Sequence, residues 1–351
     1  MNNKIKKILM MILSIILCVN MVACSKTENG KDNKSKKAVE TSKNHDNKES
    51  DNEIKDIPNT EYPLTIVDDR GRKVVIEKKP ERIAAISDML LAPLYALGGT
   101  SIAKTDSMGY GSVKGTEDLP DLGPVFIIDE EKLISLEPDL ILAQVYLHDV
   151  PAQSFDQYNL KYTMSNVKTL EDCNRNIKMV GQIIDKNKEA AKLIKDMNDK
   201  VDELVKKAPK DNKKVALLYT TGQDVQLKLN NTTAGDVCNL LGIENVAQTI
   251  VDENNIKVKG EEAPLSLEDL VKHDPEVILI NTRVTNMKDA KKAIEKNFAN
   301  NPAWNGLRAV KNGNVHFLPQ EYFLYAPVLE YEKAVEHIGK VVYPEVYKDG
   351  K

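Results

Sequence analysis

The residue types that most often carry catalysis or bind metal ions are few and scattered in this sequence. The five histidines stand at positions 45, 148, 273, 316 and 337, a spacing that does not form a hydrolytic zinc site. The chain also lacks the His-Glu-x-x-His, Gly-x-Ser-x-Gly and Gly-x-x-x-x-Gly-Lys-Ser/Thr motifs of common hydrolases and nucleotide-binding loops. We therefore expect a protein that binds without catalysis and needs no cofactor.

One cysteine predicts a covalent modification. A basic N-terminus precedes an apolar run over residues 8–19, which is shorter than the roughly 20 residues that span a bilayer and has the length of a signal-peptide core. The run is followed by Met-Val-Ala-Cys, ending at Cys24, which resembles a bacterial lipobox. We predict a signal peptide at residues 1–23 and a lipid anchor on Cys24 that holds the protein at the extracytoplasmic face of the cell membrane. The alternative is an uncleaved single-pass anchor.

The segment after Cys24 differs in composition from the rest of the chain. Residues 25–61 contain no aromatic residue and four aliphatic ones among many lysines and acids, so residues 24–61 are predicted to be a disordered tether. The remaining chain is long enough for two lobes. The net charge of -4 is mild and no basic stripe is present, which argues against a nucleic-acid partner. Cys173 and Cys238 are expected to be buried free thiols.

The chain after residue 61 alternates strand and helix patterns, which predicts an α/β fold with parallel sheets. Residues 64–67 and 73–76 flank an Asp- and Gly-rich turn and predict a hairpin. We expect two Rossmann-like lobes with mostly parallel sheets, joined by one long backbone helix. The predicted boundaries are an N-terminal lobe over residues 62–168, connecting helices over 169–210 and a C-terminal lobe over 211–351.

The connecting helices are predicted from apolar residues at three- and four-residue steps between positions 170 and 205. An unbroken helix over residues 188–207 would be about 30 Å long. Asn187 is its predicted cap. One long helix between the lobes predicts a stiff connection with a small hinge amplitude.

An internal repeat places one glutamate in each lobe. Residues 129–142 align without a gap on residues 266–279, and each copy has the pattern of an N-cap, a short helix, a proline stop and a buried strand. Glu131 aligns with Glu268 in the first helical turn. An acid there is explained by the helix dipole alone. The matched pair, however, also suits a receptor that docks on a two-fold partner through bidentate arginines.

Ligands of paired α/β lobes bind beyond the carboxyl ends of the strands. The candidate ligand-binding residues at these ends are Ser87, Asp88, Met89, Tyr110, Tyr146, His148, Tyr219, Arg283, Tyr322 and Tyr325. Tyrosines give flat contact area and one hydrogen bond, which suits a large planar or catecholate ligand. Arg283 could pair with an anionic ligand. The alternatives are ordinary rim packing for the tyrosines and for His148, and a surface salt bridge for Arg283.

The body resembles the iron-complex and cobalamin class of substrate-binding proteins. The resemblance rests on the order and spacing of eight stretches: residues 65–72, 79–83, 94–98, 133–142, 264–270, 274–278, 301–304 and 310–315. It implies the periplasmic-binding-protein fold and a monomeric receptor that binds a small-molecule iron complex, such as a ferric siderophore, for an ABC importer. It also implies that Glu131 and Glu268 dock on arginine pockets of the permease dimer.

The resemblance leaves the cargo open. Haem and cobalamin receptors belong to the same class, although Arg283 stands where haem-binding relatives place a histidine. A receptor for free metal ions is a further alternative, and it would need three or four histidine or carboxylate ligands at strand ends. A purely structural surface lipoprotein would not explain the matched glutamates.

Overall fold

The computed structural model describes residue 54 and residues 56–106, 113–284, 286–325 and 327–348. These residues fall within one structural unit, Asn47–Lys351. The predicted signal peptide, Cys24, most of the predicted tether and Tyr110 lie outside the described residues.

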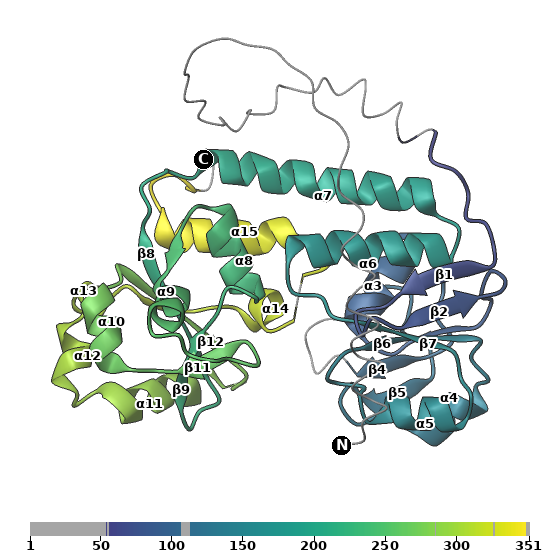
Figure 1. The fold of residues 1–351 in the computed structure, drawn as a ribbon, viewed down its shortest axis with the longest axis horizontal. Coiled ribbons are helices and arrows are strands. Elements are labelled where there is room, and N and C mark those ends of the chain that lie inside the picture. Colours follow the sequence, from purple (N-terminus) through teal and green to yellow (C-terminus); the bar gives the residue numbers. More distant parts are fainter. Residues whose placement is uncertain (1–53, 55, 107–112, 285, 326, 349–351) are drawn as a thin grey trace, which may run out of the picture. The chain divides into compact units, whose positions relative to one another are not determined.

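The N-terminal lobe contains a hairpin and two small parallel sheets (Figure 1). The hairpin pairs β1 (Leu64–Val67) antiparallel with β2 (Lys73–Ile76), as predicted. The sheets are β3 (Ile83–Ala85), β6 (Leu140–Gln144) and β7 (Tyr162–Ser165) in that order, and the pair β4 (Lys104–Asp106) and β5 (Asp121–Pro124). The helices are α3 (Asp88–Ala96), α4 (Glu130–Ser135) and α5 (Pro151–Gln157).

The C-terminal lobe is built on one six-stranded sheet. Its strands, in sheet order, are β11 (Glu262–Pro264), β9 (Val225–Lys228), β8 (Lys214–Thr220), β12 (Val277–Thr282) and β13 (Val315–Phe317), with β10 (Glu244–Asn245) paired to β8. Strand β8 pairs in parallel with β10 and β12, and β12 pairs in parallel with β13, whereas β9 pairs antiparallel with both β8 and β11. This arrangement confirms the predicted α/β class.

The helices of the C-terminal lobe follow in sequence order. They are α8 (Thr233–Leu240), α9 (Val246–Glu253), α10 (Leu267–His273), α11 (Met287–Phe298), α12 (Pro302–Gly306), α13 (Arg308–Lys311), α14 (Gln320–Phe323) and α15 (Tyr331–Val342). None of the helices in the described part of the chain has both the length and the apolar composition that a membrane crossing requires.

Successive residues of the central strands pack into different hydrophobic clusters. In β8, Val215 and Leu217 join the cluster that contains the connecting helices, whereas Ala216 and Leu218 join a second cluster within the C-terminal lobe. In β6, Leu142 and Ile141 divide between two clusters in the same way. Because side chains alternate across a strand, both sheet faces are covered, and the strands read as continuous apolar runs.

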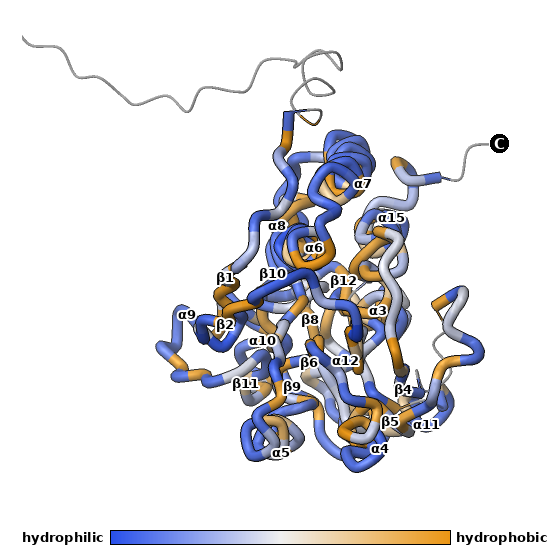
Figure 2. The backbone as a smooth tube through the Cα atoms, turned by 90° about the vertical axis from the view of Figure 1, so that its right-hand side faces the viewer, coloured by the Kyte–Doolittle hydropathy of each residue, from blue (hydrophilic) through white to orange (hydrophobic). Residues whose placement is uncertain are grey.

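Two helices, α6 (Leu170–Ile183) and α7 (Asn187–Lys207), connect the lobes (Figure 1). Helix α6 begins with a capping box between Thr169 and Asp172. Helix α7 is unbroken, as predicted, spans 21 residues and is mainly hydrophilic along its length (Figure 2). The prediction that Asn187 caps α7 is wrong. Lys186 is the N-cap, and the Asn187 side chain instead donates to the carbonyl of Pro58 at 2.8 Å.

One apolar core runs through this connection. It includes Leu142 of β6, Val180 of α6, Met197 of α7, Leu217 of β8 and Tyr331 of α15. Helix α15 of the C-terminal lobe packs directly on α7. Close packing resists changes of shape, so this core favours a stiff connection. The small hinge amplitude stays a prediction.

Candidate functional site

A cavity of about 660 Å³ lies at the carboxyl ends of the N-terminal strands. This volume is within the range of small-molecule sites. Residues after β3, β5 and β6 and along α3 line one side, and residues from α14 to the start of α15 line the other. The lining residues are Ser87, Asp88, Met89, Ala92, Tyr95, Ala96, Thr105, Val113, Lys114, Val125, Gln144, Leu147, Glu321, Tyr322, Tyr325, Pro327, Val328, Leu329 and Glu330.

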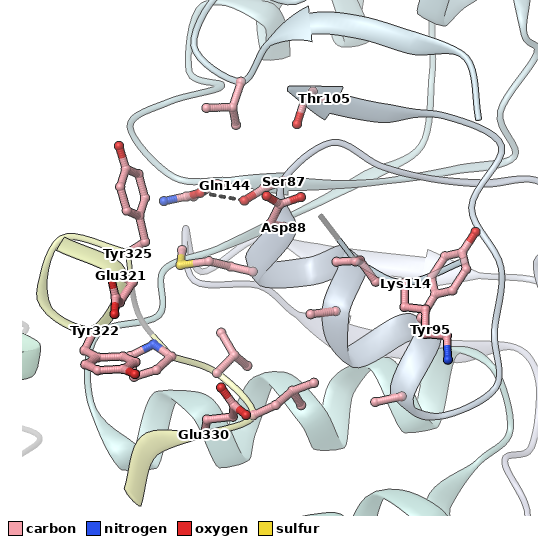
Figure 3. Close-up of a pocket in the computed structure, with 18 of the residues that line it drawn as sticks. Ser87, Asp88, Tyr95, Thr105, Lys114, Gln144, Glu321, Tyr322, Tyr325 and Glu330 are labelled. Atoms are coloured by element: carbon pink, nitrogen blue, oxygen red, sulfur yellow. Dashed lines mark hydrogen bonds between the residues drawn. The ribbon is translucent and has the colours of Figure 1, made fainter. Parts of the chain in front are cut away.

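Ser87 and Gln144 join the ends of two neighbouring strands. Ser87 is the N-cap residue of α3, but its hydroxyl makes no capping bond. It donates instead to Oε1 of Gln144 at 2.8 Å (Figure 3). Because this bond occupies the amide oxygen, the amide nitrogen of Gln144 points away from Ser87 in Figure 3 and is available to donate to a ligand.

Asp88 opens α3 and contributes a carboxylate to the cavity. Burial and, second, the nearby charge of Asp106 raise the pKa of Asp88 from its usual acidic value to about 6, against a smaller opposite effect of Lys104. The carboxyl of Asp88 therefore holds its proton more readily than an exposed aspartate does, and a positive charge beside it would favour the carboxylate.

Three tyrosines line the cavity from opposite sides. Tyr322 and Tyr325 come from α14 and the segment that follows it, and Tyr95 comes from α3 (Figure 3). Sequence reasoning missed Tyr95. The signal was present, since Tyr95 lies seven residues after Asp88 on one helix, a spacing that puts both side chains on the same face.

The structure brings half of the predicted ligand-binding residues together. Ser87, Asp88, Met89, Tyr322 and Tyr325 all line the cavity. Their contact with a ligand stays a prediction. Lys114 and Glu330 also line the cavity and were missed, because both lie in segments with no strand-end pattern.

His148 lies outside the cavity lining and is fully buried. Its Nδ1 accepts from the Gln144 backbone N–H at 2.9 Å, and its Nε2 lies 2.8 Å from the carbonyl oxygen of Val125. These two bonds fix a neutral ring with the proton on Nε2. Burial lowers the pKa of His148 to about 4, against smaller opposite effects of the bond to Val125 and the charge of Asp149. His148 thus ties two cavity-lining residues to each other.

Tyr146 and Tyr219 also lie outside the lining, beside lysines. The Nζ of Lys168 is 5.3 Å from the ring centroid of Tyr146, and the Nζ of Lys228 is 4.7 Å from that of Tyr219. Both lysines pair with Glu261. This group links the segment after β7 to the C-terminal lobe.

Arg283 follows β12, which continues two residues past the predicted strand end at residue 280. Its side chain is exposed and is not part of the cavity lining. The predicted pairing of Arg283 with an anionic ligand therefore has no support from its position.

The two repeat copies form matching helices. The predicted caps are confirmed: the Asp129 side chain accepts from Lys132 N–H in α4, and the Ser266 side chain accepts from Asp269 N–H in α10. Glu131 and Glu268 lie in the first turns and are exposed. Within the described part of the chain, neither carboxylate makes an ion pair or a side-chain hydrogen bond, so both are available to a partner.

Metal-binding groups are not assembled in the described part of the chain: no three His, Cys, Asp or Glu side chains there are arranged to hold an ion. Cys173 and Cys238 are buried free thiols, as predicted. Burial raises the pKa of both thiols because it removes the water that would stabilise the thiolate. A thiol with a raised pKa is a poor nucleophile.

A second cavity, of about 710 Å³, lies along α6 and α7 beside Ile57 and Pro58. It contains none of the predicted site residues and no strand end. We therefore place the candidate site in the first cavity.

Comparison with known proteins agrees with this fold. The chain is 24% identical over 353 residues to the uncharacterized ABC transporter substrate-binding lipoprotein YvrC of Bacillus subtilis, covering 95% of this chain and 96% of that protein. It is 23% identical to the Fe(3+)-citrate-binding protein YfmC of the same organism, covering 72% of this chain and 77% of YfmC. The solved structure of Staphylococcus aureus IsdE complexed with heme has a TM-score of 0.62 at 22% identity and covers 75% of this chain and 98% of that one.

The family model described as periplasmic binding protein matches residues 83–322, which include the connecting helices, most of both lobes and the cavity-lining residues from Ser87 to Tyr322. The chain therefore belongs to the periplasmic binding protein family.

Proposed function

We propose that this protein is the extracytoplasmic receptor of an ABC importer, that it binds a ferric siderophore or a similar iron complex in the cavity, and that it delivers this cargo to the permease. The observation that carries the proposal is a ligand-sized cavity at the strand ends of the N-terminal lobe. Tyrosines from both lobes line this cavity. Of the similar proteins, YfmC is named as a ferric-citrate-binding protein and IsdE was solved in complex with heme. Both names support an iron-containing cargo.

Haem is the second candidate cargo. Met89 lines the cavity, and a thioether is one of the axial ligands that haem iron takes. No histidine is part of the cavity lining among the described residues, so a second axial ligand from that residue type is missing there. This favours an iron complex that brings its own full set of ligands.

Delivery is proposed to depend on Glu131 and Glu268. Each is exposed in an equivalent helix of its lobe, so two matched carboxylates would meet the two halves of a permease dimer. Cys24 is the proposed lipid attachment site, with the residues up to 61 as its tether and a monomeric body beyond. The contacts of Pro58 and Thr60 with Asn187 indicate that the end of this tether touches the body.

The test is uptake of an iron complex by cells that carry the Glu131→Ala and Glu268→Ala double variant. We expect uptake to be lost while the affinity of the purified protein for the complex is unchanged. The matched control is Glu130→Ala with Asp269→Ala, which removes the neighbouring first-turn acids and should leave uptake intact. Normal uptake by the first double variant would refute the docking role.

A further inference from the structure

The charges around the cavity are unbalanced. Asp88, Glu321 and Glu330 line it, and Lys114 is the one basic residue among its described lining residues. Glu330 pairs with Lys333 at 2.7 Å, which offsets part of its charge. Residues 107–112 and 326, which lie outside the described residues, include no charged residue type.

The one basic residue of the described lining lies away from the acidic side of the cavity. Figure 3 shows Lys114 beside Tyr95, across the cavity from Glu321 and Glu330. Lys114 is also exposed, so solvent screens it. Arg283, which the sequence suggested for an anionic ligand, is not part of the lining.

Asp88 is the least screened of these carboxylates. It is partly buried, whereas Glu321 and Glu330 are exposed. Within the described part of the chain Asp88 forms no ion pair. Burial and the charge of Asp106 raise its pKa to about 6 against a smaller lowering by the charge of Lys104, so a further positive charge beside Asp88 would stabilise the carboxylate. A cationic ligand group would supply that charge.

The aromatic lining favours the same sign. Tyr95, Tyr322 and Tyr325 border the cavity, and the faces of aromatic rings attract cations. An anionic ligand would meet three carboxylates and these rings, and would gain a single exposed lysine.

Resting on the proposed function, we propose that the cavity selects a cationic iron complex over an anionic one, with Asp88 as the residue that recognises the positive group. The class of cargo this describes is a ferric complex of hydroxamate type with a free ammonium group. Ferric tricatecholates, ferric citrate and haem carry negative charge and are disfavoured.

The experiment uses three complexes with the same iron coordination and different charge. They are a ferric linear trihydroxamate with a free terminal amine, its N-acetylated neutral form and its N-succinylated anionic form. Residues 25–351, which retain every described residue, are titrated with each complex by calorimetry at pH 7.5, and with a ferric tricatecholate and haem as further anionic ligands. We expect the amine form to bind at least about tenfold more tightly than the succinylated form, which is about 1.4 kcal/mol.

Two variants assign the effect. Asp88→Asn should abolish most of the preference for the amine form, whereas Glu117→Gln, a loop carboxylate outside the lining, should retain it. Equal or tighter binding of any anionic complex, or an unchanged preference in Asp88→Asn, would overturn the inference and leave the receptor function standing. If no iron complex and no haem binds, the proposed function fails and the inference fails with it.

Discussion

His148 provides a test of how the cavity wall is held, because its protonation state and its contacts are linked. The ring accepts the Gln144 backbone N–H at Nδ1 and contacts the Val125 carbonyl through Nε2. Protonation would place a second N–H against the Gln144 N–H and break that bond. Both partner residues line the cavity, so acid should loosen its wall.

The size of the effect follows from the pKa of His148. The usual histidine value near 6.5 applies to the unfolded chain, and burial lowers the folded value to about 4. The unfolded chain therefore binds the proton first as the pH falls, so stability is complete above about pH 6.5 and declines toward pH 4. This shift corresponds to about 3 kcal/mol in total, of which about 2 kcal/mol is lost between pH 7 and pH 5.

The assay is urea unfolding of the wild type and of His148→Gln at a series of pH values. Glutamine retains a donor and an acceptor but does not titrate. We expect the variant to be less stable at pH 7, and its deficit to shrink by about 2 kcal/mol by pH 5. The other histidines are present in both proteins and cancel in the comparison. Parallel stability curves for the two proteins would refute the assignment of a buried neutral His148.

Two further substitutions test the connection between the lobes. Tyr331→Phe removes the hydrogen bond from the buried Tyr331 hydroxyl to Asp236 Oδ2 at 2.6 Å, and because Asp236 also accepts from Leu170 N–H, we expect a loss of about 1–3 kcal/mol in urea unfolding. A loss below about 0.5 kcal/mol would contradict this. Gly181→Ala would place a methyl group 2.5 Å from the Cβ of Ala190, where α6 meets α7, and should cost about 1–3 kcal/mol by the same method. A variant as stable as the wild type would show that the two helices can separate at little cost.

Features with a strong local pattern were predictable from the sequence. The hairpin of β1 and β2, helix α7 and both copies of the repeat agree with the structure, because alternation, helical periodicity and capping residues act over short stretches. Strand ends were less certain. Helical and strand boundaries depend on neighbouring elements, and β12 continues to Thr282 because its last residues still pair with β8.

The cavity was predictable in place and only in part in composition. Strand-end reasoning found Ser87 and Asp88, which lie between the end of β3 and the first turn of α3. It did not reveal that Tyr219 packs beside Lys228, because the direction of a side chain at a strand end depends on the face it occupies and on its tertiary neighbours. Glu330 reaches the cavity from the loop before α15, a proximity that the fold alone creates.

The most direct test of the central claim is a crystal structure of residues 25–351 with a bound ferric complex, measured with anomalous diffraction at the iron edge. The receptor account predicts one strong iron peak inside the cavity, bordered by Asp88 and Gln144 on one side and Tyr322 and Tyr325 on the other. An iron peak elsewhere on the protein, or an empty cavity in crystals of a complex that binds in solution, would contradict it.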